Sequence, residues 1–423
     1  MSGRAIISGF SVSLPYAENS SLLIRNLQQG KRVHLSPWFI SDNQARECGF
    51  AENIFIAKLQ RENDSAFELV YKLIDDALLQ AGLSNDSLKG NRVRVYITGI
   101  GPRVDVMDYR NFYNYNDMED VSVTSSIKNL SVKNMSQDNV SYTLGLKYEL
   151  QYLPPNMNCT SNSSLTAIHL VTRAIESGGI DLGLVINISK IKYQDLVFLA
   201  SQGMLDSKIV QPFGVNSNGV HFAEGYSVML LESQQHRMMR GKSPGVCITS
   251  AYKQINASRS NDASWQSTSI LKLIHSLLND AGVRKEDLCG FIPHGNGTSS
   301  SDKVEAKAIA MFAGETPLPV LAYKGQVGYT ATGSGVIDLI IGYHLLLTNE
   351  LIFPVINDEI IDDVACHISV EGGVRKHEKN HLLKTGLGVD GSVVALLMTN
   401  LNKSCGYVKW YLRFIIFSRG TMF

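Results

Sequence analysis

The chain has 423 residues, of which 44% are hydrophobic and 18% are charged, and its formal net charge is zero. This length supports a large globular core, and the balanced charge argues against the basic surface of a nucleic-acid-binding protein. The six cysteines are scattered, without the paired spacing of a disulfide framework or a zinc site. Free thiols, no signal-peptide pattern and no run near 18 apolar residues together predict a soluble cytoplasmic protein.

The first half of the chain alternates between apolar strand patterns and amphipathic helix patterns. In chain order we expect a strand at residues 4–14, helices at 19–30 and 65–82, a strand at 93–99, a helix after residue 159, and strands at 181–187 and 226–231. Residues 103–140 interrupt this rhythm, because they are polar, rich in Asn, Asp, Ser and Tyr, and poorly periodic. Such a segment is typical of a surface excursion or a subunit-contact region.

The same rhythm restarts near residue 244. We expect strands at 246–251, 288–293 and 392–398, and helices at 266–281, 302–312 and 334–348. The alternation predicts an α/β protein with parallel, buried sheets covered by helices, built from two similar halves of about 200 residues. We therefore divide the chain into residues 1–243, 244–403 and an apolar, cation-punctuated tail at 404–423. The tail is expected to pack on the body or on a partner, or to contact a membrane surface.

A lone cysteine marks the centre of the first half. Residues 156–165 read Asn-Met-Asn-Cys-Thr-Ser-Asn-Ser-Ser-Leu, so that small polar residues surround Cys159, and apolar residues at helical spacing follow. This pattern predicts a tight strand-to-helix turn with Cys159 near the helix N-terminus, where unpaired N–H groups and the helix dipole stabilise a thiolate. The alternative is a buried structural cysteine.

Three stretches of the second half join this cysteine turn. In residues 292–298, Ile-Pro-His-Gly-Asn-Gly-Thr, a histidine leaves a buried strand into a glycine-rich turn, with Asp302 and Glu305 in the helix that follows. Residues 321–330 read Leu-Ala-Tyr-Lys-Gly-Gln-Val-Gly-Tyr-Thr. Residues 386–392, Gly-Leu-Gly-Val-Asp-Gly-Ser, form a glycine loop before the last strand.

Taken in this order, the four stretches resemble the β-ketoacyl-acyl-carrier-protein synthases, the elongating condensing enzymes of the thiolase superfamily. That family has a cysteine in a small-residue turn, a His-Gly-Thr-Gly-Thr stretch, and a Lys-x-Asn-x-Gly-His stretch with a second histidine. The resemblance covers residues 4–400. It implies the thiolase fold, with two similar βαβαβ-type halves that form a five-layered α-β-α-β-α core.

The resemblance also implies a chemistry. An acyl chain would pass from carrier-protein phosphopantetheine to the thiolate of Cys159, and a malonyl unit would then lose carbon dioxide to give an enolate that attacks the thioester. His294 would donate a hydrogen bond to the malonyl thioester oxygen, and Lys324 and Glu305 would form a supporting ion pair. Backbone N–H groups of the cysteine turn and of the glycine loop at Gly388 would hold the developing oxyanion. No metal or redox cofactor is implied, since the substrates arrive on the carrier protein.

Several positions depart from the family pattern. Tyr329 stands where the second histidine is expected, and a phenol with a pKa near 10 donates a hydrogen bond but does not replace imidazole as a protonatable group. The loss of one oxyanion donor typically costs about 10²–10³ in rate. An efficient stand-alone condensing enzyme is therefore not expected. The other departures are Gly214 for Asp, Asn296 for Thr, Gln326 for Asn, and Val389 and Asp390 within the glycine loop.

Type II polyketide systems pair an active ketosynthase with a chain-length factor, a sister subunit that has lost catalytic residues and shapes the tunnel in which the chain grows. This sequence resembles that subunit, in a system making a polyketide, polyene or fatty acid, although many chain-length factors have also replaced the cysteine. The alternatives are a self-sufficient condensing enzyme that uses Cys159, His294 and Tyr329, and a non-catalytic carrier-protein docking scaffold. The expected partners are a ketosynthase α subunit in a heterodimer, or a second copy in a homodimer, and acyl carrier protein. Candidate docking cations are Lys208, Arg237 and Arg240.

Overall fold

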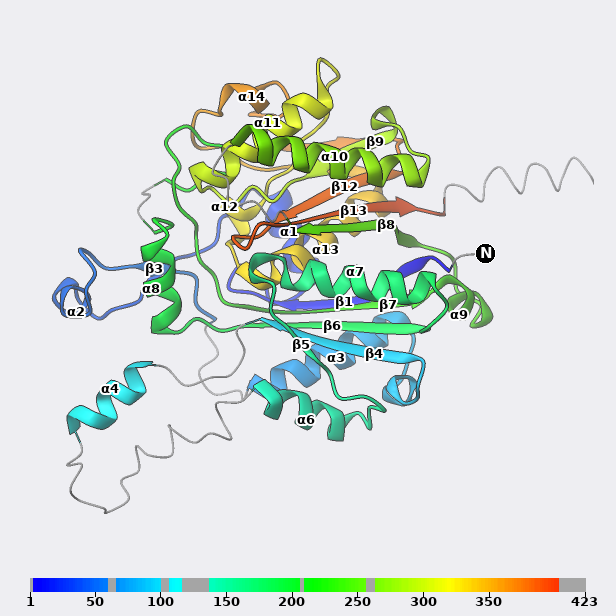
Figure 1. The fold of residues 1–423 in the computed structure, drawn as a ribbon, viewed down its shortest axis with the longest axis horizontal. Helices are drawn as coiled ribbons and strands as arrows, with labels where there is room; N and C mark the ends of the chain where they lie inside the picture. Colours follow the sequence, from blue (N-terminus) through cyan, green and yellow to red (C-terminus); the bar gives the residue numbers. More distant parts are fainter. Residues whose placement is uncertain are drawn as a thin grey trace, which may run out of the picture.

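The computed structural model describes residues 3–59, 66–99, 106–115, 137–205, 209–255 and 263–402 (Figure 1). Predictions for the tail at 404–423, for Lys208 and for residues 103–105 and 116–136 of the polar segment lie outside the described residues. The described part of that segment contains helix α4 (Val106–Tyr115) and the start of helix α6 (Gln137–Lys147).

Within the described residues, nine strands form the main sheet, and the strands of the two halves meet at its middle. The five strands of the N-terminal half end at β1, and the four strands of the C-terminal half begin at β8. Two residue pairs, Ala5 with Ile248 and Ile6 with Cys247, join these two strands. In spatial order the strands are β5 (Asn156–Met157), β4 (Val93–Gly99), β6 (Leu182–Ser189), β7 (Gly225–Ser233), β1 (Ala5–Ser13), β8 (Val246–Ile255), β13 (Ser392–Asn400), β12 (His381–Leu387) and β9 (Leu288–Ile292).

The prediction of purely parallel sheets is wrong, because both halves are mixed. Strand β7 runs antiparallel to β6 and β1, and β13 runs antiparallel to β12 and β8. The pairs β4–β6 and β9–β12 are parallel, as expected. A strand that is buried on both faces reads as a continuous apolar run in either direction, so the sequence pattern does not reveal its orientation.

Helices cover both faces of each half, and the expected five-layered α-β-α-β-α arrangement is confirmed (Figure 1). Because successive side chains of a strand point to opposite faces, alternate residues of β13 enter different cores. Val394 and Leu396 pack in the central core with helices α7 and α13, whereas Val393 and Ala395 pack in an outer core with α10 and α11. The other outer core contains α3 and α6. The bounds of these helices are α3 (Ala66–Ala81), α7 (Ser163–Glu176), α10 (Ala263–Ala281), α11 (Ser299–Ala313) and α13 (Ser334–Thr348).

The central helix α13 is apolar on nearly all sides because sheets and helices surround it. The stretch Ala331–Thr348 is long and apolar enough to cross a membrane by length and composition, but 72% of it is buried inside the protein. This burial is typical of a core helix. The remaining elements are α1 (Ser20–Gln28), β2 (Ser36–Pro37), α2 (Asp42–Glu47), β3 (Phe55–Ile56), α8 (Tyr193–Ser201), α9 (Gln234–Met239), α12 (Lys324–Val327), β10 (Glu350–Phe353), α14 (Asp362–Ala365) and β11 (Gly373–Lys376).

Candidate active site

The turn between β5 and α7 is as sharp as the sequence predicts. Cys159 directly precedes a 3-10 turn, Thr160–Asn162, which leads into α7. The backbone N–H of Cys159 donates to Ser163 Oγ at 2.9 Å, and that hydroxyl donates to the Thr160 carbonyl at 2.7 Å. Thr160 has a φ of 49°, a left-handed conformation that is uncommon for a β-branched residue. The turn is therefore held in one strained shape.

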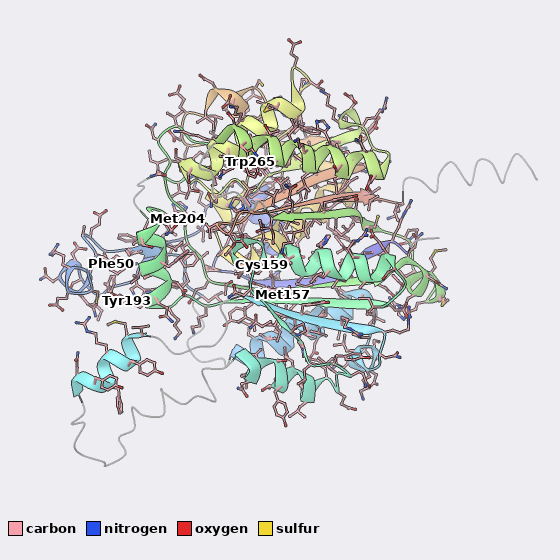
Figure 2. The ribbon with its side chains drawn as sticks, in the orientation of Figure 1. Phe50, Met157, Cys159, Tyr193, Met204 and Trp265 are labelled. Atoms are coloured by element: carbon pink, nitrogen blue, oxygen red, sulfur yellow. The ribbon has the colours of Figure 1, made fainter. Side chains whose placement is uncertain are left out.

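This turn presents Ser161, and not Cys159, to the cavity. Ser161 lines a cavity of about 680 Å³ together with His294 and Tyr329, and its Oγ lies 2.6 Å from Tyr329 Oη. Cys159 is not among the lining residues, and its Sγ accepts a hydrogen bond from Lys253 Nζ of β8 at 3.6 Å. Figure 2 shows Cys159 near Met157, at the start of α7. The geometry therefore places Ser161 where Cys159 was predicted, beside His294 and Tyr329.

Two carboxylates of α11 shape the loop that carries His294. Glu305 accepts the backbone N–H groups of His294 and Gly295 at 2.8 Å each. Asp302 accepts the N–H groups of Asn296 and Gly297 at 3.1 and 3.0 Å. Burial raises the pKa of Asp302 to about 7, while these N–H groups act in the opposite direction. Both acidic residues therefore act on the backbone of the loop, which positions the buried His294.

The predicted ion pair between Lys324 and Glu305 is wrong, because Lys324 has a different partner. Its Nζ lies 2.8 Å from Asp338 Oδ2 on α13, and Lys384 Nζ of β12 lies at the same distance from the same oxygen. These three side chains are only 4%, 3% and 1% exposed for Lys324, Asp338 and Lys384. Sequence reasoning missed Lys384 and Asp338. The sequence does place Lys384 within an apolar strand, and a buried ammonium group requires a partner of opposite charge. That position could therefore have indicated a buried ion pair.

Among the side chains that line the cavity, His294 and Tyr329 are both uncharged at neutral pH. Burial, followed by the charges of Lys324 and Lys384, holds the pKa of His294 well below its usual range. Burial raises the pKa of Tyr329, although hydrogen bonds with Ser161 and Asn296 lower it in part. The rings of His294 and Tyr329 meet edge to face, with centroids 6.1 Å apart. The cavity thus contains a neutral imidazole and a protonated phenol.

The glycine loop forms one wall of this cavity and is bonded to the turn. Gly388 and Val389 line the cavity as predicted, but the Gly388 N–H donates to the Ser392 carbonyl at 2.8 Å. Asp390 Oδ1 accepts from Ser392 Oγ at 2.6 Å and from Thr160 Oγ1 at 3.3 Å. The backbone N–H groups of Gly388 and Cys159 therefore both donate hydrogen bonds to acceptors within the protein. An oxyanion role for the other N–H groups of the turn and of the glycine loop, including that of Val389, stays a prediction.

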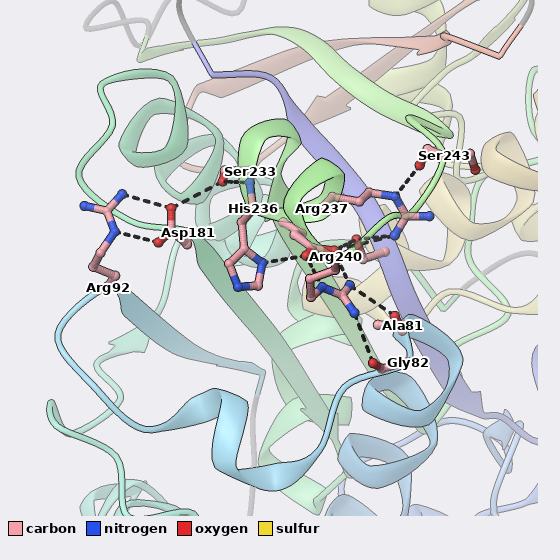
Figure 3. Close-up of polar contacts among 11 residues, drawn as sticks. Ala81, Gly82, Arg92, Asp181, Ser233, His236, Arg237, Arg240 and Ser243 are labelled. Carbon is pink, nitrogen blue, oxygen red and sulfur yellow. Dashed lines mark hydrogen bonds and ion pairs between the residues drawn. The ribbon is translucent and has the colours of Figure 1, made fainter.

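Arg237 and Arg240, the candidate docking cations, belong to a partly buried network (Figure 3). Arg240 donates to both carboxylate oxygens of the fully buried Glu232 at 2.9 Å, and His236 Nδ1 lies 2.6 Å from the same carboxylate. Arg237 donates to Ser8 Oγ at 2.9 Å, and Ser8 in turn donates to Glu232. These arginines stabilise the junction of α9 with the sheet, so the structure gives no support to a docking role. Within the described ranges, no group of three or more His, Cys, Asp or Glu side chains is placed to hold a metal ion.

Comparison with protein families gives two matches that together cover most of the chain. The family model described as the N-terminal domain of beta-ketoacyl synthase matches residues 4–237, and that of the C-terminal domain matches residues 245–359. Two solved structures share the fold at 17% identity and cover 94% of this chain. One is a type II polyketide synthase acyl-carrier protein in complex with its ketosynthase bound to the hexaketide (AntDE:AntF), with a TM-score of 0.78 over 100% of that chain. The other is the ishigamide ketosynthase/chain length factor, with a TM-score of 0.77 over 99% of that chain. The expected thiolase-type fold is thereby confirmed.

Curated relatives match a smaller share of this chain, at higher sequence identity, and are mostly much longer. The chain is 27% identical over 273 residues to the pikromycin polyketide synthase component PikAII of Streptomyces venezuelae, a match that covers 63% of this chain and 7% of that protein. It is 24% identical over 257 residues to the polyketide biosynthesis malonyl-ACP decarboxylase PksF of Bacillus subtilis, covering 58% of this chain and 60% of that protein. The chain thus spans less than two thirds of the length of either relative.

Proposed function

Because this chain belongs to the β-ketoacyl synthase family, we propose that it is the chain-length-factor subunit of a heterodimeric ketosynthase and has no efficient condensing site of its own. The observation that carries this proposal is the hydrogen bond of 2.6 Å between Ser161 and Tyr329 inside the cavity. Condensation through a covalent acyl-enzyme needs an activated nucleophile at this place. The cavity offers a hydroxyl bonded to a phenol instead.

Nothing bonded to Ser161 can act as its base. A serine nucleophile is activated by an adjacent group that takes its proton. In the part of the chain that the structure describes, the side chain of Ser161 has Tyr329 as its hydrogen-bond partner, and burial raises the pKa of that phenol. Cys159, the thiol nearest in the sequence, lies outside the cavity lining. These contacts argue against a self-sufficient condensing enzyme that uses Cys159, His294 and Tyr329.

A second candidate function is the decarboxylation of malonyl carrier protein. In this reaction the malonyl thioester loses carbon dioxide, and the remaining enolate takes up a proton to give the acetyl thioester, so no protein nucleophile is needed. Hydrogen-bond donors at the thioester oxygen would stabilise this enolate, and His294 and Tyr329, which line the cavity, are two candidates. The similarity to a protein named as a malonyl-ACP decarboxylase favours this candidate.

The proposal includes partners that deliver and elongate the substrate. Acyl and malonyl groups would arrive on the phosphopantetheine of acyl carrier protein, and the partner ketosynthase would supply the thiolate. This division of labour requires no metal or redox cofactor, and we place it in the cytoplasm. A chain that serves only as a docking scaffold would not need the cavity beside His294.

Intact-protein mass spectrometry tests these assignments. The purified chain, alone and with its neighbouring ketosynthase, is incubated with acyl- and malonyl-carrier protein, and carbon dioxide release is followed in parallel. We expect the isolated chain to stay unmodified and to be required for product in the presence of its partner. Acylation of the isolated chain that is lost in C159A or S161A would overturn the proposal.

Three further variants separate the other candidates. Carbon dioxide release by the isolated chain that disappears in H294A and Y329F supports the decarboxylase. A product that forms unchanged with the H294A/Y329A double variant shows that neither side chain is needed for product formation, a result compatible with a chain-length factor or a docking scaffold but not with a self-sufficient condensing enzyme that uses them.

A further inference from the structure

A second buried lysine lies under the His294 loop and takes no part in the function proposed above. Lys384 belongs to β12, which pairs in parallel with β9, and the register places Lys384 opposite Ile292. Strand β9 ends at Ile292, so that Pro293 and His294 are the next residues of the neighbouring chain segment. The Lys384 side chain is 1% exposed and does not line the cavity. Its ammonium group therefore contacts the backbone of the site and not the cavity itself.

The contacts of Lys384 converge on the peptide that carries His294. Its Nζ donates to the Pro293 carbonyl at 3.0 Å and also to the Thr385 carbonyl. The same Nζ lies 2.8 Å from Asp338 Oδ2. Lys324 reaches that carboxylate at 2.8 Å too, but lies at 3.5 Å from the Pro293 carbonyl. Lys384 is thus the closer of the two lysines to the residue preceding His294.

Thr385, the residue after Lys384, is linked to the same loop through Glu305. Thr385 Oγ1 donates to Glu305 Oε1 at 2.6 Å, and this oxygen also accepts the His294 N–H. Gly386 follows and begins the glycine loop, and its carbonyl accepts from Asn162 Nδ2 of the turn at 3.3 Å. The end of β12 therefore links the histidine loop to the glycine loop and, through it, to the turn that carries Ser161.

We propose that Lys384 is a positioning residue, which anchors the Pro293–His294 peptide and thereby fixes the His294 side chain in the cavity. The proposal rests on the proposed function in one respect, namely that His294 serves as a donor to a bound acyl or malonyl thioester. The anchoring itself depends only on the contacts of Lys384, so it can be tested without substrate.

Charge supports the same role. The charged or titratable groups that face this region are Lys324 from α12, Asp338 from α13, Glu305 and Asp302 from α11, and Lys384 itself. Burial lowers the pKa of Lys384 to about 8, so the side chain remains mostly cationic at pH 7. The positive charges of Lys324 and Lys384 both disfavour an imidazolium at His294. Removing Lys384 should therefore free the His294 ring to move and make its protonated form less unfavourable.

The test is an NMR titration of the full chain labelled with ¹³C at histidine Cε1, with the His294 signal identified by its absence in H294N. In the wild-type chain we expect the pKa of His294 to lie well below its usual range, because the ring is buried beside Lys324 and Lys384. In K384M the midpoint should rise by about one pH unit, as expected when a nearby like charge is removed. K384R, which keeps the charge, should retain the wild-type curve, and so should K376M, which alters an exposed lysine of β11.

An identical His294 titration in folded K384M and in the wild-type chain would overturn the proposal. Should K384M not fold, K384Q gives the same comparison with a polar, uncharged side chain. This readout does not involve acyl chemistry, so failure of the proposed function, seen as acylation of the isolated chain, is a separate result.

Discussion

The buried cluster of Lys324, Lys384 and Asp338 gives a strong test of what holds the site together. In D338N both ammonium groups lose the carboxylate that lies 2.8 Å from each of them, and neither lysine has another ion-pair partner within the described residues. Breaking a buried ion pair by removing one partner costs about 3–5 kcal/mol of unfolding free energy. An unfolding entropy of about 2 cal/mol/K per residue gives about 0.9 kcal/mol/K for a chain of this size, so the melting temperature should fall by about 3–6 °C.

Thermal unfolding followed by circular dichroism at pH 7 measures this effect. The matched control is E371Q, which removes an ion pair to Arg375 of 3.1 Å whose side chains are 83% and 52% exposed. A pair exposed to this degree contributes about 0–1 kcal/mol, so the control should shift by about 1 °C or less. The D338N/K384M double variant should recover part of the loss, because it carries one unpaired charge fewer. A D338N shift no larger than that of E371Q would refute the reasoning.

Three other predictions concern the residues that line the cavity. S161C places a thiol beside Tyr329 and should gain an acyl group from acyl carrier protein, detected as a mass increase, whereas acylation of Cys159 in that variant would contradict the assignment. Because the folded chain keeps His294 neutral and the unfolded chain binds a proton below about pH 6.5, His294 contributes stability that is lost as the pH falls below 6.5. The urea midpoint of H294N should therefore fall less than that of the wild-type chain between pH 7.5 and 5.5, and equal falls would argue against a neutral ring. Y329F removes the hydroxyl that is hydrogen-bonded with Ser161 and Asn296 and should cost about 1–3 kcal/mol in urea unfolding; an unchanged midpoint would show that these hydrogen bonds contribute nothing.

The elements of this fold follow from the sequence more readily than their directions do. The periodicity predicts residues 334–348 as a helix and 93–99 as a strand, and both are present with these bounds. The same reasoning misses the antiparallel direction of β7 and β13, since burial on both faces erases the polar alternation that distinguishes a one-sided antiparallel strand. Which way a buried strand runs depends on connections and long-range pairing, which local patterns do not encode.

At the site, residue type misled the sequence analysis at one position. A cysteine in a small-residue turn is readily assigned as the nucleophile. The residue that reaches the cavity is Ser161, two positions after Cys159. A 3-10 turn rotates successive side chains by about 120°, so a two-residue offset changes which side of the turn a side chain faces. The meeting of His294 with Tyr329 was predictable from their motifs. The pairing of Lys324 with Asp338 was not, because any of several buried acids could have stood beside it.

The hydrogen bonds around the cavity favour the proposal that this chain shapes the cavity for an acyl chain and does not catalyse condensation there. A catalytic site keeps donors in place for charge that develops only in the transition state, and those donors cost no reorganisation when the reaction occurs. Here the Gly388 N–H donates to the Ser392 carbonyl, and the Cys159 N–H donates to Ser163 Oγ. The Ser161 hydroxyl is hydrogen-bonded to the Tyr329 hydroxyl. An oxyanion bound at these groups would have to break an existing hydrogen bond for each contact that it gains. Glu305 nevertheless continues to fix the His294 loop through its backbone, so the form of the cavity does not depend on the reactivity of its lining.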